Sequence, residues 1–217
     1  MPNTLIRDFS EDGVKDSYSK VAWFYDGWSW LTESKAAKRV IDLADIKSGE
    51  QILEVAVGTG LVFREILKKN PNGVNKGTDI SPSMLDRAIK RMEKLNMTNY
   101  ELTIGNAYQL PFEDNSFDLV INNFMIDLLP EADFNRILSE FKRVLTPSGR
   151  VVISTMAFGE KWHNTIWHWV ANVFPDLLTG CRPVSIGDHL KGVGFHVERI
   201  DQISQWTFPS EVVCARK

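Results

Sequence analysis

The sequence has few cysteines and histidines, and neither residue type forms a recognisable site. Only Cys181 and Cys214 occur among the 217 residues, too few for a disulfide framework and without the spacing of metal ligands. The four histidines show no metal-binding pattern, so we expect no metal site. We interpret both cysteines as packing residues in a reducing, cytoplasmic compartment.

The sequence also lacks a strong charge excess and a long apolar run. Its formal net charge is −3, with the two signs interspersed, whereas a nucleic-acid-binding domain usually carries a basic face. No apolar run reaches the roughly 18 residues that span a bilayer, and residues 1–8 do not resemble a secretory signal. We therefore expect a cytoplasmic protein with no nucleic-acid partner and no transmembrane segment.

From residue 51 onward, strand-like and helix-like segments alternate. This alternation predicts an α/β fold with a Rossmann-like, doubly wound sheet of about seven strands, mostly parallel and with helices on both faces. The last two strand candidates, residues 195–203 and 212–215, are too close for a parallel crossover, so we expect an antiparallel C-terminal strand. The other predicted strands are 51–57, a strand closing at 77–79, 100–104, 117–121 and 150–155.

A glycine-rich turn follows the first predicted strand. Small residues at Ala56, Gly58 and Gly60 let the backbone turn tightly and let a ligand approach closely. The helix that follows presents its first N–H groups to such a ligand. This motif is also typical of other nucleotide sites, and of a simple strand-to-helix turn.

Polar residues follow the next two predicted strands. Asp79 can accept hydrogen bonds from the ribose hydroxyls of an adenosine; its alternative is a helix-capping role, for which Ser81 is better placed. Asn106 can hydrogen-bond a base edge, although alone it is typical of a turn.

Taken together, these residues resemble the class I S-adenosylmethionine-dependent methyltransferases. The matching stretches are 53–61, 77–85, 105–118 and 145–149. Within that superfamily the chain is similar to the small branch that contains quinone-biosynthesis C-methyltransferases and bacterial phosphatidylethanolamine N-methyltransferases. The resemblance implies S-adenosyl-L-methionine as cofactor, S-adenosyl-L-homocysteine as product, and methyl transfer to a small molecule.

The resemblance also implies a role for each matching position. Two positions depart from the family pattern: Ala56 stands where a glycine is usual, and Asn106 where an aspartate is usual. The implied cofactor-binding residues are Glu54, Ala56, Gly58, Thr59 and Gly60 at the methionine part, Asp79 at the ribose, Ile80, Met84, Asn106 and Ala107 at the adenine, and Asn122, Asn123 and Phe124 beside the sulfonium and the substrate.

Two polar residues are candidates for catalysis near the methyl group. Tyr25 belongs to an N-terminal segment that closes over the cofactor in the family. Asp127 lies shortly after the fourth strand, where relatives often carry a histidine; its alternative role is to cap the helix near Pro130. A general base is needed only if the acceptor loses a proton during the reaction.

We predict one domain over residues 1–217. Its parts are a helical lid (1–50), the cofactor-binding core (51–155), a substrate-roof insertion (156–183), and a C-terminal helix with a strand hairpin (184–217). Six of the seven tryptophans lie in the lid and the insertion. An aromatic roof suits an apolar or aromatic acceptor such as a quinone precursor or a lipid, although the same rings can simply pack the roof onto the core.

Two other functions use the same motifs. A non-catalytic protein that binds S-adenosylmethionine would carry the same binding residues. An NAD-dependent oxidoreductase also has a glycine-rich turn and an acidic residue near position 79, but Glu54 and the antiparallel tail argue against it. The lysines and arginines beside the aromatics of residues 1–50 permit peripheral membrane contact.

Overall fold

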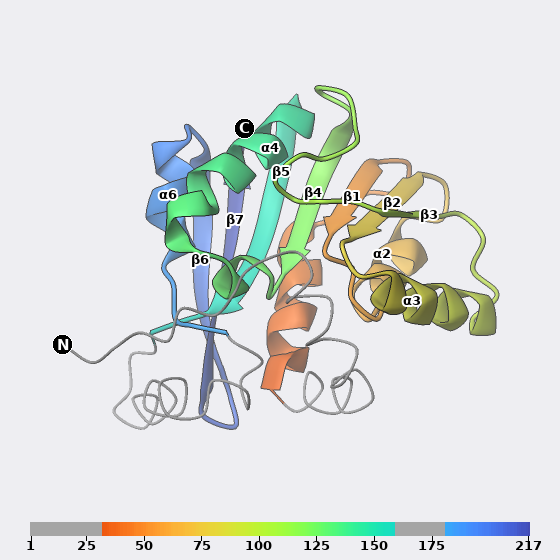
Figure 1. The fold of residues 1–217 in the computed structure, drawn as a ribbon, viewed down its shortest axis with the longest axis horizontal. Coiled ribbons are helices and arrows are strands. Elements are labelled where there is room, and N and C mark those ends of the chain that lie inside the picture. Colours follow the sequence, from red (N-terminus) through yellow and green to blue (C-terminus); the bar gives the residue numbers. More distant parts are fainter. Residues whose placement is uncertain (1–31, 159–180) are drawn as a thin grey trace.

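The computed structural model describes residues 32–158 and 181–217. A seven-stranded sheet in the order β3-β2-β1-β4-β5-β7-β6 forms its centre (Figure 1). The first five strands are parallel, and β7 is antiparallel to both β5 and β6, which confirms the predicted fold class. The strands are β1 (Gln51–Val55), β2 (Val74–Asp79), β3 (Glu101–Ile104), β4 (Phe117–Asn123), β5 (Leu145–Met156), β6 (His196–Gln205) and β7 (Phe208–Arg216).

Helices cover both faces of the sheet. A helix over residues 32–44, α2 (Phe63–Lys69) and α3 (Pro82–Lys94) pack on one face, where Val40, Phe63 and Met92 join one hydrophobic cluster. On the other face, α4 (Phe134–Val144) and α6 (Ile186–Gly192) build a second cluster that includes Phe141 and Leu190. The 3₁₀ helices η1 (Ile126–Leu128) and η2 (Glu131–Asp133) lead from β4 into α4.

The amphipathic patterns explain these layers. In α4 the residues at helical spacing, among them Phe134, Ile137 and Leu138, are fully buried, as one apolar stripe on a surface helix requires. Strands β4 and β7 are buried on both faces, whereas the edge strand β6 alternates between exposed and half-buried residues. Side-chain periodicity therefore separates the middle of this sheet from its edge.

Two element boundaries differ from the sequence-based expectation. Strand β5 begins at Leu145 rather than Arg150, because Leu145 already pairs with Phe117 before the regular ladder begins at Arg150 and Leu119. The β6–β7 hairpin has a two-residue turn at Trp206 and Thr207, since Gln205 pairs directly with Phe208. A longer connection over 206–209 was expected; Phe208 and Pro209 instead belong to β7.

The strand order reverses direction at β1. The chain runs from β1 outward through β2 to β3, and then returns to place β4 on the other side of β1. In such open sheets a ligand binds in the crevice beyond the carboxyl ends of the strands at the reversal point. We therefore expect a ligand site at the carboxyl ends of β1, β2 and β4, and we call this region the crevice.

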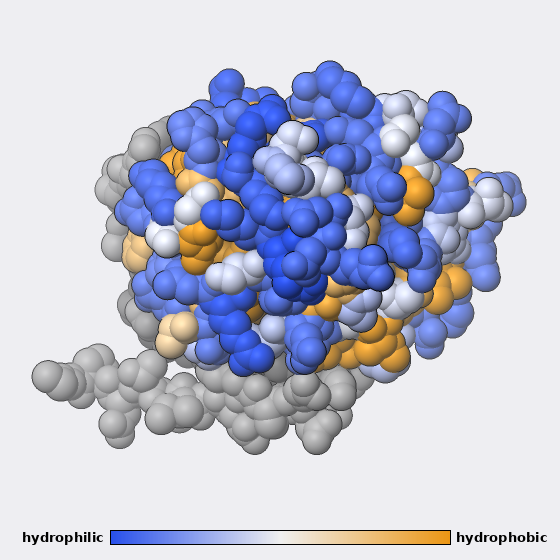
Figure 2. Space-filling model, turned by 90° about the horizontal axis from the view of Figure 1, so that it is seen from above, coloured by the Kyte–Doolittle hydropathy of each residue, from blue (hydrophilic) through white to orange (hydrophobic). Residues whose placement is uncertain are grey.

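The end of the sheet at which the parallel strands begin has a mostly hydrophilic surface (Figure 2). Among the helices of the described ranges, none is long and apolar enough to cross a membrane.

Candidate functional site

The site begins where three parallel strands end side by side. Val55 is in register with Thr78 of β2 and with Asn122 of β4. The residues that follow these positions therefore leave the sheet at the same level. This register brings sequence-based candidates from three separate stretches to the same end of the sheet.

The turn after β1 consists largely of left-handed backbone. Ala56, Gly58 and Gly60 have φ angles of 61°, 56° and 80°. A Cβ atom at Gly60 would lie 3.2 Å from the Cβ of Ala88, so this glycine allows α3 to pack closely. A Cβ atom at Gly58 would meet no other atom within 4 Å. The backbone at Gly58 thus borders open space that a ligand can enter.

Asp79 connects this turn to the start of α3. Its Oδ2 accepts a hydrogen bond from Gly58 N at 2.7 Å, and its Oδ1 accepts one from Ser81 N at 2.9 Å. Burial raises the pKa of the Asp79 carboxyl, while the backbone N–H donors of Ser81, Gly58 and Ile80 oppose that shift. Ser81 is the N-cap residue of α3 and Pro82 occupies its first turn, as expected, although the Ser81 side chain makes no capping hydrogen bond. The Asp79 carboxylate performs part of that role and keeps further acceptor capacity.

Two buried acceptors near the ends of β1 and β4 have no hydrogen-bond partner among the described residues. Glu54 is 1% exposed and its Oε2 is unpaired. Asn122 donates from Nδ2 to Val55 O at 2.9 Å, which leaves its Oδ1 unpaired. Burial, and then the charge of Asp79, hold the pKa of Glu54 well above its ordinary value. Because an unpaired buried acceptor is costly, this crevice is suited to a ligand that brings hydrogen-bond donors and positive charge.

The segment after β4 forms the other wall. Asn123 accepts a hydrogen bond at Oδ1 from Ser154 Oγ at 2.6 Å. Phe124 adopts a left-handed φ of 49° and donates its N–H to Ser154 O at 3.0 Å. Its ring centroid lies 6.3 Å from that of Phe208 in β7. Strained, non-glycine backbone of this kind is often found at functional sites, and here it turns the chain out of the sheet at the crevice.

Asp127 is fully buried in η1. Its Oδ2 accepts a hydrogen bond from Met156 N at 2.8 Å, and its Oδ1 has no partner among the described residues. Desolvation raises the pKa of Asp127 to about 7, opposed by the bond from Met156 and increased by the charge of Glu33. The alternative role as a helix cap was wrong, because the carboxylate binds the end of β5 and neither η2 nor α4 has a side-chain cap.

The predicted adenine side follows β2 and β3. Asn106 accepts a hydrogen bond at Oδ1 from Tyr108 N at 3.0 Å, which is a turn-forming contact. Gly105 N donates to Asp79 O at 3.1 Å, so this loop begins beside the ribose candidate. Thr59, Met84, Ile80 and Ala107 occupy the same loops or the start of α3; the first two are buried and the last two are half-buried.

Some candidates were missed and others lie outside the described residues. Glu33 and Cys181 interact with Asp127, although they are far from it in sequence. The one available signal was an acidic residue next to the apolar stripe of a helix. Tyr25, most of the predicted lid (1–50) and most of the roof insertion (156–183) fall within residues 1–31 and 159–180, which the structure does not describe.

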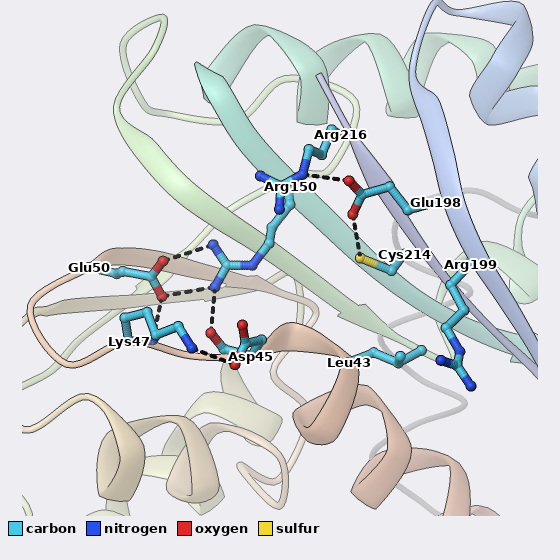
Figure 3. A pocket seen from close by; sticks show the side chains of 9 residues that line it. All are labelled: Leu43, Asp45, Lys47, Glu50, Arg150, Glu198, Arg199, Cys214 and Arg216. Carbon is cyan, nitrogen blue, oxygen red and sulfur yellow. Dashed lines mark hydrogen bonds and ion pairs between the residues drawn. The ribbon is translucent and has the colours of Figure 1, made fainter.

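A cavity of about 390 Å³ lies toward the end of the sheet at which the parallel strands begin (Figure 3). Arg150 crosses its middle and binds Glu50 through two hydrogen bonds of 2.8 and 2.9 Å. Arg216 pairs with Glu198 at 2.6 Å. These opposite charges neutralise each other, so we interpret the cavity as a structural junction between strands and not as the site. In the ranges that the structure covers, no cluster of side chains could hold a metal ion.

Comparison with known proteins agrees with this geometry. Residues 52–149 match the family described as methyltransferase domain. The chain is 33% identical over 152 residues to a demethylmenaquinone methyltransferase of Bacillus cytotoxicus, an alignment that covers 68% of this chain. It spans only 63% of the length of that relative.

Solved structures share the fold at low sequence identity. A SAM-dependent methyltransferase from Aquifex aeolicus superposes with a TM-score of 0.66 at 20% identity, covering 96% of this chain and 99% of that one. A putative methyltransferase of Haloferax volcanii, solved in a complex with the Trm112 methyltransferase activator, gives a TM-score of 0.76 at 19% identity. The alignment covers 94% of this chain and 96% of that one.

Proposed function

We propose that this chain, in which residues 52–149 match the methyltransferase domain family, transfers the methyl group of S-adenosylmethionine to a small, apolar or aromatic acceptor. The observation that carries this proposal is the crevice at the ends of β1, β2 and β4. There, the open turn at Gly58 is bonded to the carboxyl of Asp79, which interacts electrostatically with the buried carboxyl of Glu54.

The residues present fit the cofactor group by group. S-adenosylmethionine supplies an electrophilic methyl on a positive sulfur, an ammonium group and two ribose hydroxyls. The unpaired Oε2 of Glu54 is suited to an ammonium donor, because it is a buried acceptor without a partner among the described residues. Asp79 keeps lone pairs for ribose hydroxyls. Gly58 presents the free space that an approaching ligand needs.

On the acceptor side, the chain supplies apolar walls and one titratable group. Phe124 and Phe208 are nearly fully buried and form an aromatic wall beside Asn123. Such a wall keeps water away from the reacting atoms and helps align the acceptor. Asp127 has a pKa of about 7, which suits a group that takes up a proton near neutral pH. We propose that it accepts the proton lost by a hydroxyl or ring carbon when that acceptor is methylated.

The acceptor class is supported by the relatives. They are named demethylmenaquinone methyltransferases, and a quinone ring is apolar, aromatic and hydroxylated in its reduced form. We therefore propose a quinone-type or similar aromatic ring as the first acceptor to test, with lipids next. The lid role of residues 1–50, the roof role of residues 156–183 and a catalytic role for Tyr25 remain part of this proposal.

Calorimetric titration of the protein with S-adenosylmethionine and S-adenosylhomocysteine tests the cofactor. Asp79→Asn removes the charge at the ribose position, and we expect an affinity loss of about tenfold or more. Asp118→Asn is the matched control, because Asp118 also accepts a backbone N–H, from Gln51 at 2.9 Å, but at the other end of the sheet. Equal losses in both variants, or binding of NAD in place of the adenosyl compounds, would refute the proposal.

A second assay separates an enzyme from a protein that only binds. Labelled methyl groups are followed from S-adenosylmethionine into reduced quinone analogues, phospholipids and simple phenols. We expect transfer to an aromatic hydroxylated ring, with a rate that falls in Asp127→Asn while cofactor affinity stays unchanged. Tight cofactor binding with no transfer to any acceptor would favour the non-catalytic alternative.

A further inference from the structure

The turn of the β6–β7 hairpin presents a tryptophan to solvent. Trp206 is 75% exposed, more than the other exposed large apolar side chains of the described residues. An exposed tryptophan is unusual because the indole has a large apolar surface that is normally buried, with its N–H hydrogen-bonded. Its exposure therefore calls for a partner surface.

The backbone at this turn is unfavourable for the residues that occupy it. Trp206 and Thr207 both have positive φ, at 49° and 67°. Two-residue hairpin turns of this type prefer Asn-Gly, because a bulky or β-branched residue is strained there. Local folding therefore does not explain a tryptophan at this position, and such an outlier points to a function for the side chain.

Hydrogen bonds and ring packing anchor the base of the turn beside the candidate site. Gln205 accepts a hydrogen bond at Oε1 from Lys35 N at 2.7 Å and donates from Nε2 to Ser34 Oγ at 2.9 Å. On the facing strand, Phe208 is 1% exposed and packs near Phe124 at the crevice. The helix over residues 32–44 and the wall of the site thus both hold the base of the turn.

Two other exposed residues, Phe158 and Lys35, lie near the turn at the same end of the sheet. Phe158 is 57% exposed and follows Ala157, which donates its N–H to Pro209 O at 3.0 Å. Lys35 is exposed on the neighbouring helix. Figure 1 shows the hairpin extending past the carboxyl ends of the parallel strands. This end of the sheet therefore combines two exposed aromatics and a cation near the candidate site.

We propose that the β6–β7 turn is a docking point for an anionic lipid surface, with Trp206 inserted among the headgroups. Tryptophan is enriched at the membrane–water interface, where its apolar ring and its N–H are both satisfied. Lys35 beside it is complementary to negatively charged headgroups. A single ring on a protruding turn fits a deformable lipid layer, whereas docking to a second copy would require a matching hollow.

Docking through the β6–β7 turn would orient the carboxyl ends of the parallel strands toward the bilayer. A lipid-soluble acceptor, as under the proposed function, would then enter the site without crossing water. This consequence rests on the proposed function, but the docking itself does not. The two are tested separately, because vesicle binding needs no cofactor and cofactor binding needs no vesicle.

The test is co-sedimentation with vesicles of phosphatidylcholine and phosphatidylglycerol, compared with vesicles of phosphatidylcholine alone. The key variant is Trp206→Asn with Thr207→Gly, which removes the ring and supplies the turn sequence that this backbone prefers. We expect vesicle partitioning to fall by about tenfold, the effect of losing one buried large apolar side chain. Thermal stability should stay the same or rise, so a loss of binding cannot be attributed to unfolding.

Leu95→Asn is the matched control. Leu95 is 45% exposed and follows the last residue of α3. This helix leads from the end of β2 back toward the start of β3, so Leu95 lies away from the carboxyl ends of the strands. This variant should bind vesicles like the parent protein. Equal partitioning of the parent and the turn variant, or no partitioning of a parent protein that binds S-adenosylmethionine normally, would overturn the proposal. A dimer seen by light scattering in the parent but not in the turn variant would assign Trp206 to self-association instead.

Discussion

Asp127 is fixed to the end of β5 by one hydrogen bond, in which Met156 N lies 2.8 Å from its Oδ2. The bond joins the segment after β4 to the last residue of the neighbouring strand. It uses one oxygen of a completely buried carboxyl and leaves the other without a partner among the described residues. The protonation of this group therefore has consequences for both stability and chemistry.

Asp127→Asn should change how stability depends on pH. The pKa of Asp127 is about 7 in the folded protein and about 4 in an unfolded chain. Between these values the folded state binds more protons, so the free energy of unfolding falls as pH rises, by up to about 1.4 kcal/mol per pH unit. The variant should lose this component, as measured by urea unfolding across that range. Glu54 adds a slope of the same sign, so an unchanged total slope in Asp127→Asn would contradict the prediction.

Ala56→Gly should stabilise the protein. Ala56 has a φ of 61°, which costs an L-residue about 1–2 kcal/mol, while glycine loses roughly 0.5–1 kcal/mol of that gain through chain entropy. We expect a net gain of about 0.5–1 kcal/mol in denaturant unfolding. Ala132→Gly, at an exposed position of η2 without positive φ, should instead destabilise. A loss of stability in both variants would show that Ala56 is not strained.

Asn106→Asp should tighten cofactor binding. The Oδ1 of Asn106 is used by Tyr108 N in the turn, whereas an aspartate can keep that bond and offer a second, charged oxygen to the adenine amine. We expect the dissociation constant for S-adenosylmethionine to fall by about three- to tenfold in calorimetry. A weaker affinity would mean that residue 106 acts only within its turn.

Arg150→Met should lower the free energy of unfolding, because it removes the ion pair with Glu50 in the cavity of Figure 3. The guanidinium binds both oxygens of Glu50 and the carbonyls of Ala44 and Asp45. Removing one partner of such a mostly buried pair typically costs about 3–5 kcal/mol. Chemical unfolding of Arg150→Met, of Glu50→Gln and of the double variant gives the coupling energy.

The losses should be clearly less than additive in the double variant, because the unpaired carboxylate causes much of the cost. Arg150 also holds the pKa of Glu50 below its ordinary value, against the effect of burial. Stability from this pair is therefore present above the unfolded pKa and lost as pH falls through the folded one. Additive losses would refute the pairing.

The positions of the candidate cofactor residues could be predicted from the sequence because the information for them is local. The turn at Ala56 follows β1 directly, Asp79 is the last residue of β2 and Asn122 lies near the end of β4, and the carboxyl ends of parallel strands meet at one end of the sheet. The acceptor half could not be predicted in the same way, because Glu33 and Cys181 meet Asp127 only after the sheet has formed. The strain at Trp206 was also invisible, since φ is not a property of composition.

The strand order also predicts a hierarchy of amide hydrogen exchange. β2, β1, β4, β5 and β7 are hydrogen-bonded on both sides, whereas the edge strands β3 and β6 are held only through β2 and β7. A local opening that frees β7 releases β6 as well, so the β6 amides that bond β7 should exchange at least as fast as those of β7. The slowest amides should belong to β1 and β4, beneath the crevice. The strands that open most rarely would then hold the residues of the candidate site, while the amides of the β6–β7 hairpin exchange on a faster timescale.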